Sequence, residues 1–100
     1  MEVVVADHAD ELQERIRLAP GTLIAARIKR ARKEKKFSHD RLGALVGGVT
    51  RQHLIKLEKA KHRPRAEMLT KIAEATGREV DWFLDPDVDP SPFPEDGDQR

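Results

Sequence analysis

The sequence predicts an all-α domain made of five or six short helices. Apolar residues recur three or four positions apart in most segments, which is the spacing of one face of a helix. Serine or threonine stands before several of these segments and glycine or proline after them, as is typical of helix ends. The connections are short, and no stretch alternates convincingly as a strand would. With 100 residues, we expect one small domain.

The first 20 residues predict an extra N-terminal helix. Asp7 can cap its start, its first turn is acidic, and Arg15 and Arg17 lie near its end, which suits the helix dipole. Its apolar seam is too short to sustain a coiled coil alone, so it must pack on its own domain or on a second copy. The seam consists of Val5, Ala9, Leu12, Ile16 and Ala19.

Residues 21–84 hold the remaining helices. Pro20-Gly21 stops the first helix, and Thr22 can cap a second one over about residues 23–36, after which Phe37 is expected to anchor the core. The inward face of this helix is expected to carry Ile24, Ile28 and Ala31. The basic residues expected around that face are Arg27, Lys29, Arg30, Arg32 and Lys33.

Two short helices joined by a glycine turn come next. Ser38 is the expected cap of a helix over about residues 39–46, and Thr50 that of a helix over about residues 51–59. Gly47-Gly48 between them predicts a tight turn. The core-facing residues of the later helix are Leu54 and Leu57.

The last predicted helix follows Pro64 and covers about residues 66–76, with Gly77 in the usual position after a helix end. Its inward face carries Leu69, Ile72 and Ala73. A short apolar turn is then expected to cap the core with Val80, Trp82, Phe83 and Leu84. Residues 85–100 are rich in proline and aspartate, and their composition predicts a disordered acidic tail.

Charge is strongly segregated along the chain, although the net charge is only +1. Residues 1–20 have a net charge of −3, residues 21–65 of +11 and residues 66–100 of −7. A positive field of this kind favours a polyanion as partner, whereas isolated charge runs are usually only solvated surface. The charge therefore needs support from a motif.

The helix predicted after Thr50 provides such a motif. Hydrogen-bond donors lie at its start and along one face, where a helix entering the major groove of DNA reaches base edges. Arginine can donate two bonds to guanine, and glutamine can pair bidentately with adenine. The residues concerned are Arg51, Gln52, His53 and Lys56.

At this point the chain resembles the phage-repressor-like helix-turn-helix family of the Cro/XRE type. The resemblance covers about residues 22–84 and implies a lambda-repressor-like five-helix domain, to which residues 1–20 add a helix. Each element of the pattern is weak alone, but their order and spacing together are specific. The matching residues are Arg32, Ser38, Leu42, Gly47, Thr50, Glu58, Pro64, Ile72-Ala73, Gly77 and Asp81-Trp82.

The resemblance also implies roles for individual residues. Arg51, Gln52, His53 and Lys56 match positions that face bases. Arg32 and Glu58 match a buried structural ion pair. The positions that match contacts to the DNA backbone are Ser38, His39, Thr50, Lys59, Lys61, His62, Arg63 and Arg65, of which Ser38 and Thr50 are helix caps first.

Three positions depart from the family pattern. Gly43 stands where the family prefers alanine, at a cost of about 1 kcal/mol in helix propensity. Ala60 stands where the family usually has the glycine that ends the recognition helix. Gly47-Gly48 makes the turn one residue longer than usual, which is expected either to tilt the two helices or to be absorbed in a wider loop.

Other kinds of function find little support in the sequence. The four histidines lack the spacing of a metal site, and no catalytic triad, phosphate loop or carboxylate pair stands out, so we expect no enzyme, metal or cofactor. There is no cysteine for a disulfide or a thiolate site. No apolar run is long enough to cross a membrane, and we expect a soluble, cytoplasmic protein.

The sequence thus predicts a transcriptional regulator, most simply a repressor that binds double-stranded DNA as a homodimer on a palindromic operator. Two surfaces are candidates for the dimer contact, the seam around Leu12 and Ile16 and the segment 82–84. The alternative is an antitoxin whose main partner is a toxin protein, bound by the acidic tail or by the N-terminal helix. A third possibility is a coactivator-like protein whose helix-turn-helix binds another protein and not DNA. The net charge of +11 in residues 21–65 argues against it.

Overall fold

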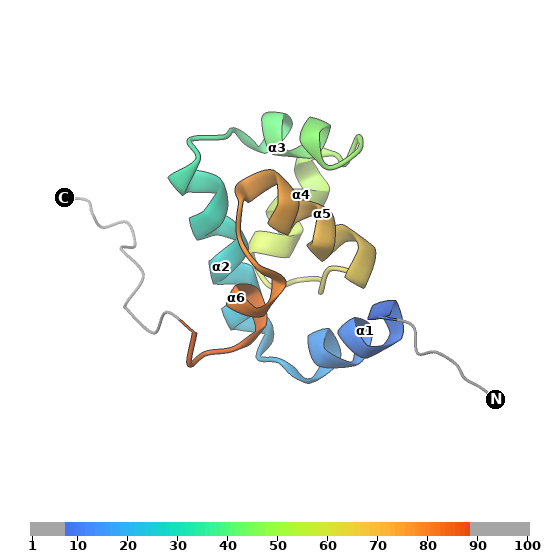
Figure 1. Cartoon of the computed structure of the whole chain (residues 1–100). Helices are drawn as coiled ribbons and strands as arrows, with labels where there is room; N and C mark the ends of the chain where they lie inside the picture. The colour runs from blue at the N-terminus through green and yellow to red at the C-terminus, as the bar shows by residue number, and fades with distance from the viewer. Residues whose placement is uncertain (1–7, 89–100) are drawn as a thin grey trace.

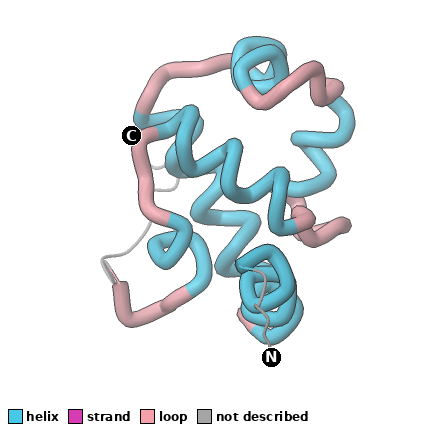
Figure 2. The backbone as a smooth tube through the Cα atoms, turned by 45° about the vertical axis from the view of Figure 1, so that its right-hand side comes forward, coloured by secondary structure: helices cyan, strands magenta, loops and turns pink. Residues whose placement is uncertain are grey.

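A computed structural model describes residues 8–88 of the chain (Figure 1). Within this range the chain forms helices, loops and turns and no strand (Figure 2), which confirms the predicted all-α class. Asp7, Val5 and residues 89–100 of the predicted tail lie outside the described residues. The helices are α1 (His8–Leu18), α2 (Gly21–Glu34), α3 (His39–Leu45), α4 (Arg51–Glu58), α5 (Ala66–Thr76) and α6 (Val80–Leu84).

The central helix of the fold is α2. It packs against α4, α5 and α6, while α1 lies on α5 and α3 contacts α4 and α5 (Figure 1). All six helices send apolar side chains into one core, as the helical spacing of those residues predicted. The core residues that are less than 2% exposed include Ile16, Ile24, Ile28, Leu42, Leu54, Leu57, Leu69, Ile72 and Phe83.

The start of α2 differs from the prediction. The helix begins at Gly21 and not after Thr22, because the carbonyl of Pro20 already accepts the first helical bonds, from Leu23 N (3.1 Å) and Ile24 N (3.2 Å). Pro20 has the extended conformation of a cap residue, with φ −61° and ψ 125°. Thr22 is therefore an exposed residue inside the first turn, and its predicted capping role is wrong.

The two caps predicted for α3 and α4 are confirmed. Ser38 Oγ accepts a hydrogen bond from Arg41 N at 3.0 Å, and Thr50 Oγ1 accepts one from His53 N at 3.1 Å. Each bond satisfies an amide that has no partner within its own helix. These caps fix where each helix of the α3–turn–α4 unit begins.

The turn between α3 and α4 folds back onto Gly43. Gly47 and Gly48 both have positive φ, 105° and 84°, and the amides of Gly48 and Val49 both reach the carbonyl of Gly43, at 2.9 and 3.1 Å. As a result the Val49 carbonyl lies only 2.1 Å from where a Cβ on Gly43 would be. The extra turn residue and the glycine at position 43 therefore belong to one local arrangement.

The end of α4 keeps the usual geometry without the usual glycine. Ala60 has φ 62°, its amide bonds to the carbonyl of Leu57 (3.2 Å), and the amide of Lys61 bonds to that of Lys56 (2.9 Å). These two bonds form a Schellman motif, in which the residue with positive φ is normally glycine. The departure at Ala60 changes the energy of this helix end and not its hydrogen bonding.

The C-terminal segment packs on α2 through α6. Trp82, Phe83 and Leu84 are buried, as predicted for a cap of the core. Arg27, expected outside the inward face of α2, is only 2% exposed and donates to the Trp82 carbonyl. The guanidinium carbons of Arg27 and Arg78 lie 5.0 and 4.1 Å from the centroid of the Trp82 ring, at cation–π distance.

The apolar residues considered for a dimer contact are largely used within the chain. Ile16 is fully buried in the core, and residues 82–84 are at most 5% exposed. Leu12 packs partly buried against the same core. The homodimer stays a prediction, and its interface would have to use residues other than these buried ones. None of the helices between residues 8 and 88 is long and apolar enough to cross a membrane.

Replacing Gly43 with alanine is expected to destabilise the protein, although alanine favours a helix. The new Cβ would collide with the Val49 backbone carbonyl, and overpacking of this kind costs about 1–3 kcal/mol. Thermal unfolding should show a lowered melting temperature for Gly43→Ala. A stability gain of about 1 kcal/mol, the helix-propensity value, would contradict the close approach.

Replacing Ala60 with glycine is expected to raise the unfolding free energy by about 1 kcal/mol. Positive φ costs an L-residue about 1–2 kcal/mol, and glycine avoids most of that cost. Ala44→Gly, the same chemical change at an exposed position inside α3, is the matched control and should lower stability by about 1 kcal/mol. Chemical denaturation measures both, and equal losses would contradict the prediction.

Candidate nucleic-acid interface

The exposed face of α4 carries the four residues predicted to face bases. Leu54 and Leu57 hold the opposite face of this helix in the core, at 0% and 1% exposure. Because α4 turns about 100° per residue, Gln52 and Lys56 lie on the side away from these two leucines, and Arg51 and His53 lie at its edges. All four predicted residues are indeed exposed, namely Arg51, Gln52, His53 and Lys56.

Arg51 is paired with an acidic residue of α3. Its Nη2 lies 3.1 Å from Asp40 Oδ2, and the two side chains are 57% and 68% exposed. An ion pair this exposed contributes little to stability and is readily exchanged for another partner. Asp40 thus holds the guanidinium at the start of α4 without preventing it from binding elsewhere.

The end of α4 is held by a buried ion pair with α2. Arg32 donates through Nε to Glu58 Oε2 at 2.7 Å and through Nη2 to Oε1 at 3.1 Å, a bidentate arrangement. The two side chains are only 10% and 6% exposed. Arg32 Nη1 also donates to the carbonyl of Phe37 at 2.9 Å, so the pair fixes the α2–α3 connection as well. The pairing that the resemblance implied is present in this form.

His39 joins this network through its ring. Nε2 lies 3.1 Å from Glu58 Oε1, so the first residue of α3 contacts the last residue of α4. The expected contact with the DNA backbone was through the main-chain amide of His39. The ring contact does not involve this amide, which lies at the start of α3. Nothing in the local sequence indicates the ring contact, because the two residues are 19 positions apart.

The connection from α4 to α5 extends the basic surface beyond α4. Lys59, Lys61 and His62 are exposed. The His62 ring stacks on that of His53, with centroids 6.1 Å apart and planes 25° from parallel. This contact places the connection directly beside the exposed face of α4.

Arg63 makes contacts within the protein, although it is an exposed residue. Its Nη1 donates to the carbonyls of Ile16 (2.7 Å) and Ala19 (2.6 Å), at the end of α1. One nitrogen of its guanidinium thus caps another helix, a role that the resemblance did not imply. A side chain of α1 also contacts this region, because Gln13 Oε1 accepts a hydrogen bond from Ala66 N at 2.9 Å.

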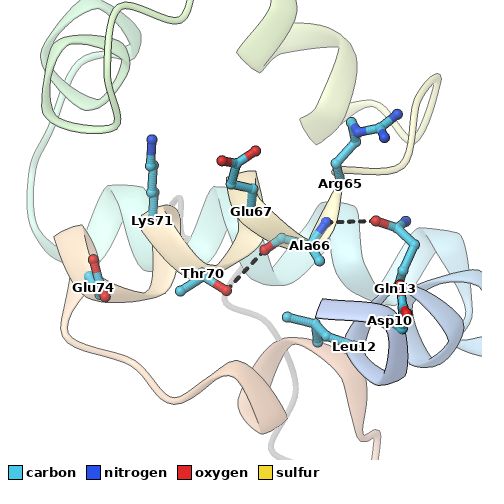
Figure 3. Close-up of a pocket in the computed structure, with 9 residues that line it drawn as sticks. All are labelled: Asp10, Leu12, Gln13, Arg65, Ala66, Glu67, Thr70, Lys71 and Glu74. Atoms are coloured by element: carbon cyan, nitrogen blue, oxygen red, sulfur yellow. Dashed lines mark hydrogen bonds between the residues drawn. The ribbon is translucent and has the colours of Figure 1, made fainter. Parts of the chain in front are cut away.

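Arg65, the last of the predicted backbone contacts, stands at the cap position of α5 and is exposed. It is one of the residues that line the groove between α1 and α5, and its side chain extends away from Gln13 (Figure 3). That open groove, of about 680 Å³, has carboxylates on both walls and gathers no metal site. Among residues 8–88, no three His or acidic residues lie close enough to hold an ion.

Two short capped helices at a glycine turn, with exposed donors on the second and a basic connection after it, define a helix-turn-helix DNA-binding protein. A comparison with protein families supports this assignment, because the helix-turn-helix family of the Cro/XRE type matches residues 28–83. The chain belongs to this family, with a lambda-repressor-like fold, and is a DNA-binding transcription regulator. Comparisons with curated proteins and with solved structures gave no significant match.

Removing the Glu58 carboxylate is expected to destabilise the protein severely. Glu58→Ala leaves Arg32 as a buried charge without its partner, and breaking such a pair costs about 3–5 kcal/mol. Glu67→Ala, at an exposed glutamate of α5, is the control and should stay within about 0.5 kcal/mol of the wild type. Urea denaturation of both proteins provides the measurement, and similar small losses would show that the ion pair contributes little.

Proposed function

We propose that this protein is a repressor that binds a palindromic operator in double-stranded DNA as a homodimer. The observation that carries the proposal is the exposed donor face at the start of α4, beside the basic connection that follows it. A recognition helix reads base edges with residues near its N-terminal end. Arg51, Gln52, His53 and Lys56 are therefore proposed as the base-reading residues.

The contacts to the DNA backbone are proposed on both sides of this face. The amides at the start of α3, near Ser38 and His39, and at the start of α4, near Thr50, suit phosphate oxygens. The basic connection supplies charge on the other side. Phosphate contacts fix the position of the protein without reading sequence. The proposed side-chain contacts are Lys59, Lys61, His62 and Arg65, and Arg63 is left out because it caps α1.

A dimer is proposed because one such helix reads only a few base pairs. Two copies on an inverted repeat would place their recognition helices about one turn of DNA apart, roughly 34 Å, or a multiple of that distance. Occupation of a promoter by such a dimer is enough to repress transcription.

A selection from randomised duplex DNA at near-physiological salt tests this proposal. An inverted repeat among the retained sequences would support sequence-specific binding by a dimer and identify the operator. Retention of duplexes without a common motif, or no retention, would contradict the proposal. In that case co-purification would test for a protein partner such as a toxin.

Arg51→Ala is expected to weaken binding to the selected operator by about 1–3 kcal/mol and to relax the preference at one base pair. The reason is the loss of a two-pronged donor at the entering end of α4. Lys59→Ala is the control and should weaken all duplexes alike, with a smaller salt dependence. Binding assays on the operator and on single-base variants distinguish the two, and an unchanged base preference in Arg51→Ala would exclude base reading by this residue.

A further inference from the structure

Two hydrogen-bonded contacts join α1 to the end of the α4–α5 connection and to the start of α5, and α1 accepts in both. In the first, Arg63 Nη1 reaches the carbonyls of Ile16 (2.7 Å) and Ala19 (2.6 Å). The carbonyl of Ile16 would normally accept from the residue four positions later, but that residue is Pro20, which has no amide hydrogen. Arg63 thus supplies donors to a helix end that Pro20 leaves without one.

The second contact runs from α1 to the start of α5. Ala66 is the first residue of α5, so its amide has no partner within the helix, and it is buried at 5% exposure. Arg65 occupies the cap position but makes no capping bond with its side chain. Gln13 supplies the missing acceptor from α1, at 2.9 Å (Figure 3). The two segments therefore cap each other's helices.

This mutual capping is anchored by the core. Ile16, whose carbonyl is one of the two acceptors, has a fully buried side chain, and α1 packs along α5. The guanidinium of Arg63 also lies against Gly21, where a Cβ would be 3.3 Å from Nη2. The connection is thus held near its C-terminal end against α1 and the start of α2, while Lys59 and Lys61 remain exposed.

We infer that α1 is a positioning element for DNA binding, and that Arg63 and Gln13 act as positioning residues through it. The inference rests on the proposed function, in which Lys61 and its neighbours contact the DNA backbone. The matched family region begins at residue 28, so α1 is an addition to it. Its two contacts hold the phosphate-contacting connection in the conformation that DNA requires.

The physical basis is the population of the binding-competent conformation. When a binding segment must be ordered first, the apparent affinity falls in proportion to the competent fraction. The loss of one such hydrogen bond changes a local equilibrium on the order of three- to tenfold. Because neither Arg63 nor Gln13 touches a phosphate in this arrangement, the number of counterions released on binding stays the same.

The experiment compares the full chain with three variants, Arg63→Met, Gln13→Met and Lys61→Met. The probe is a short fluorescein-labelled duplex of mixed sequence, titrated at several salt concentrations between about 50 and 200 mM. Circular dichroism at the assay temperature confirms that each protein is folded. Methionine keeps much of the length of each side chain while removing its hydrogen-bonding group.

We expect Arg63→Met and Gln13→Met to bind on the order of three- to tenfold more weakly at every salt concentration, with an unchanged slope of log K against log salt. Lys61→Met, which removes a proposed phosphate contact, should instead reduce that slope by about 0.9. If Arg63→Met fails to fold, Gln13→Met alone carries the test, since a role in stability only would leave its affinity unchanged.

Two results would overturn the inference. Wild-type affinity in folded Arg63→Met and Gln13→Met would show that α1 does not position the connection. A slope reduced by about 0.9 in Arg63→Met, together with an unaffected Gln13→Met, would make Arg63 a phosphate contact after all. Failure of the wild-type protein to bind duplex DNA would instead contradict the proposed function and is distinct from both.

Discussion

The arrangement of the proposed DNA-binding surface depends on the buried ion pair between Arg32 and Glu58. The helix that presents that surface, α4, has only eight residues, and an isolated helix of this length is marginal in water. Its start is fixed by the Thr50 cap and its end by Glu58, which binds Arg32 of α2 and the ring of His39 of α3. One carboxylate therefore sets the relative positions of three helices, and desolvation makes its pairing obligatory.

The departures from the family pattern fall into two physical kinds. Gly43 and the longer Gly47-Gly48 turn compensate each other, because the turn brings a backbone carbonyl where only a glycine leaves room. Ala60 has no such compensation: it adopts a left-handed conformation and keeps both Schellman hydrogen bonds at an energetic cost. At Gly43 the packing is preserved because the turn has changed as well. At Ala60 the hydrogen bonds are preserved, but the stability of the helix end is lowered.

The sequence predicts what depends on neighbouring residues and misses what depends on distant ones. The caps Ser38 and Thr50, the core leucines of α4 and the end of α5 at Gly77 follow from local spacing. By contrast, Arg63 bonds to residues 44 and 47 positions away and His39 to one 19 away, and no spacing rule connects these partners. Thr22 failed as a cap because Pro20 fills that position by its own conformation. The roles toward DNA, and the dimer, stay predictions.

The distribution of cations has a consequence for how this protein can bind DNA. Residues 21–65 have a net charge of +11, but several of their arginines serve the fold. Arg27 is buried beside Trp82, Arg32 forms a buried ion pair with Glu58, and Arg63 caps the end of α1. The buried Arg27 and Arg32 add to the long-range field but cannot reach phosphates, so they release no counterions. Net charge therefore overstates the number of possible phosphate contacts, and exposed cations such as Lys59 and Lys61 beside α4 are the candidates for them.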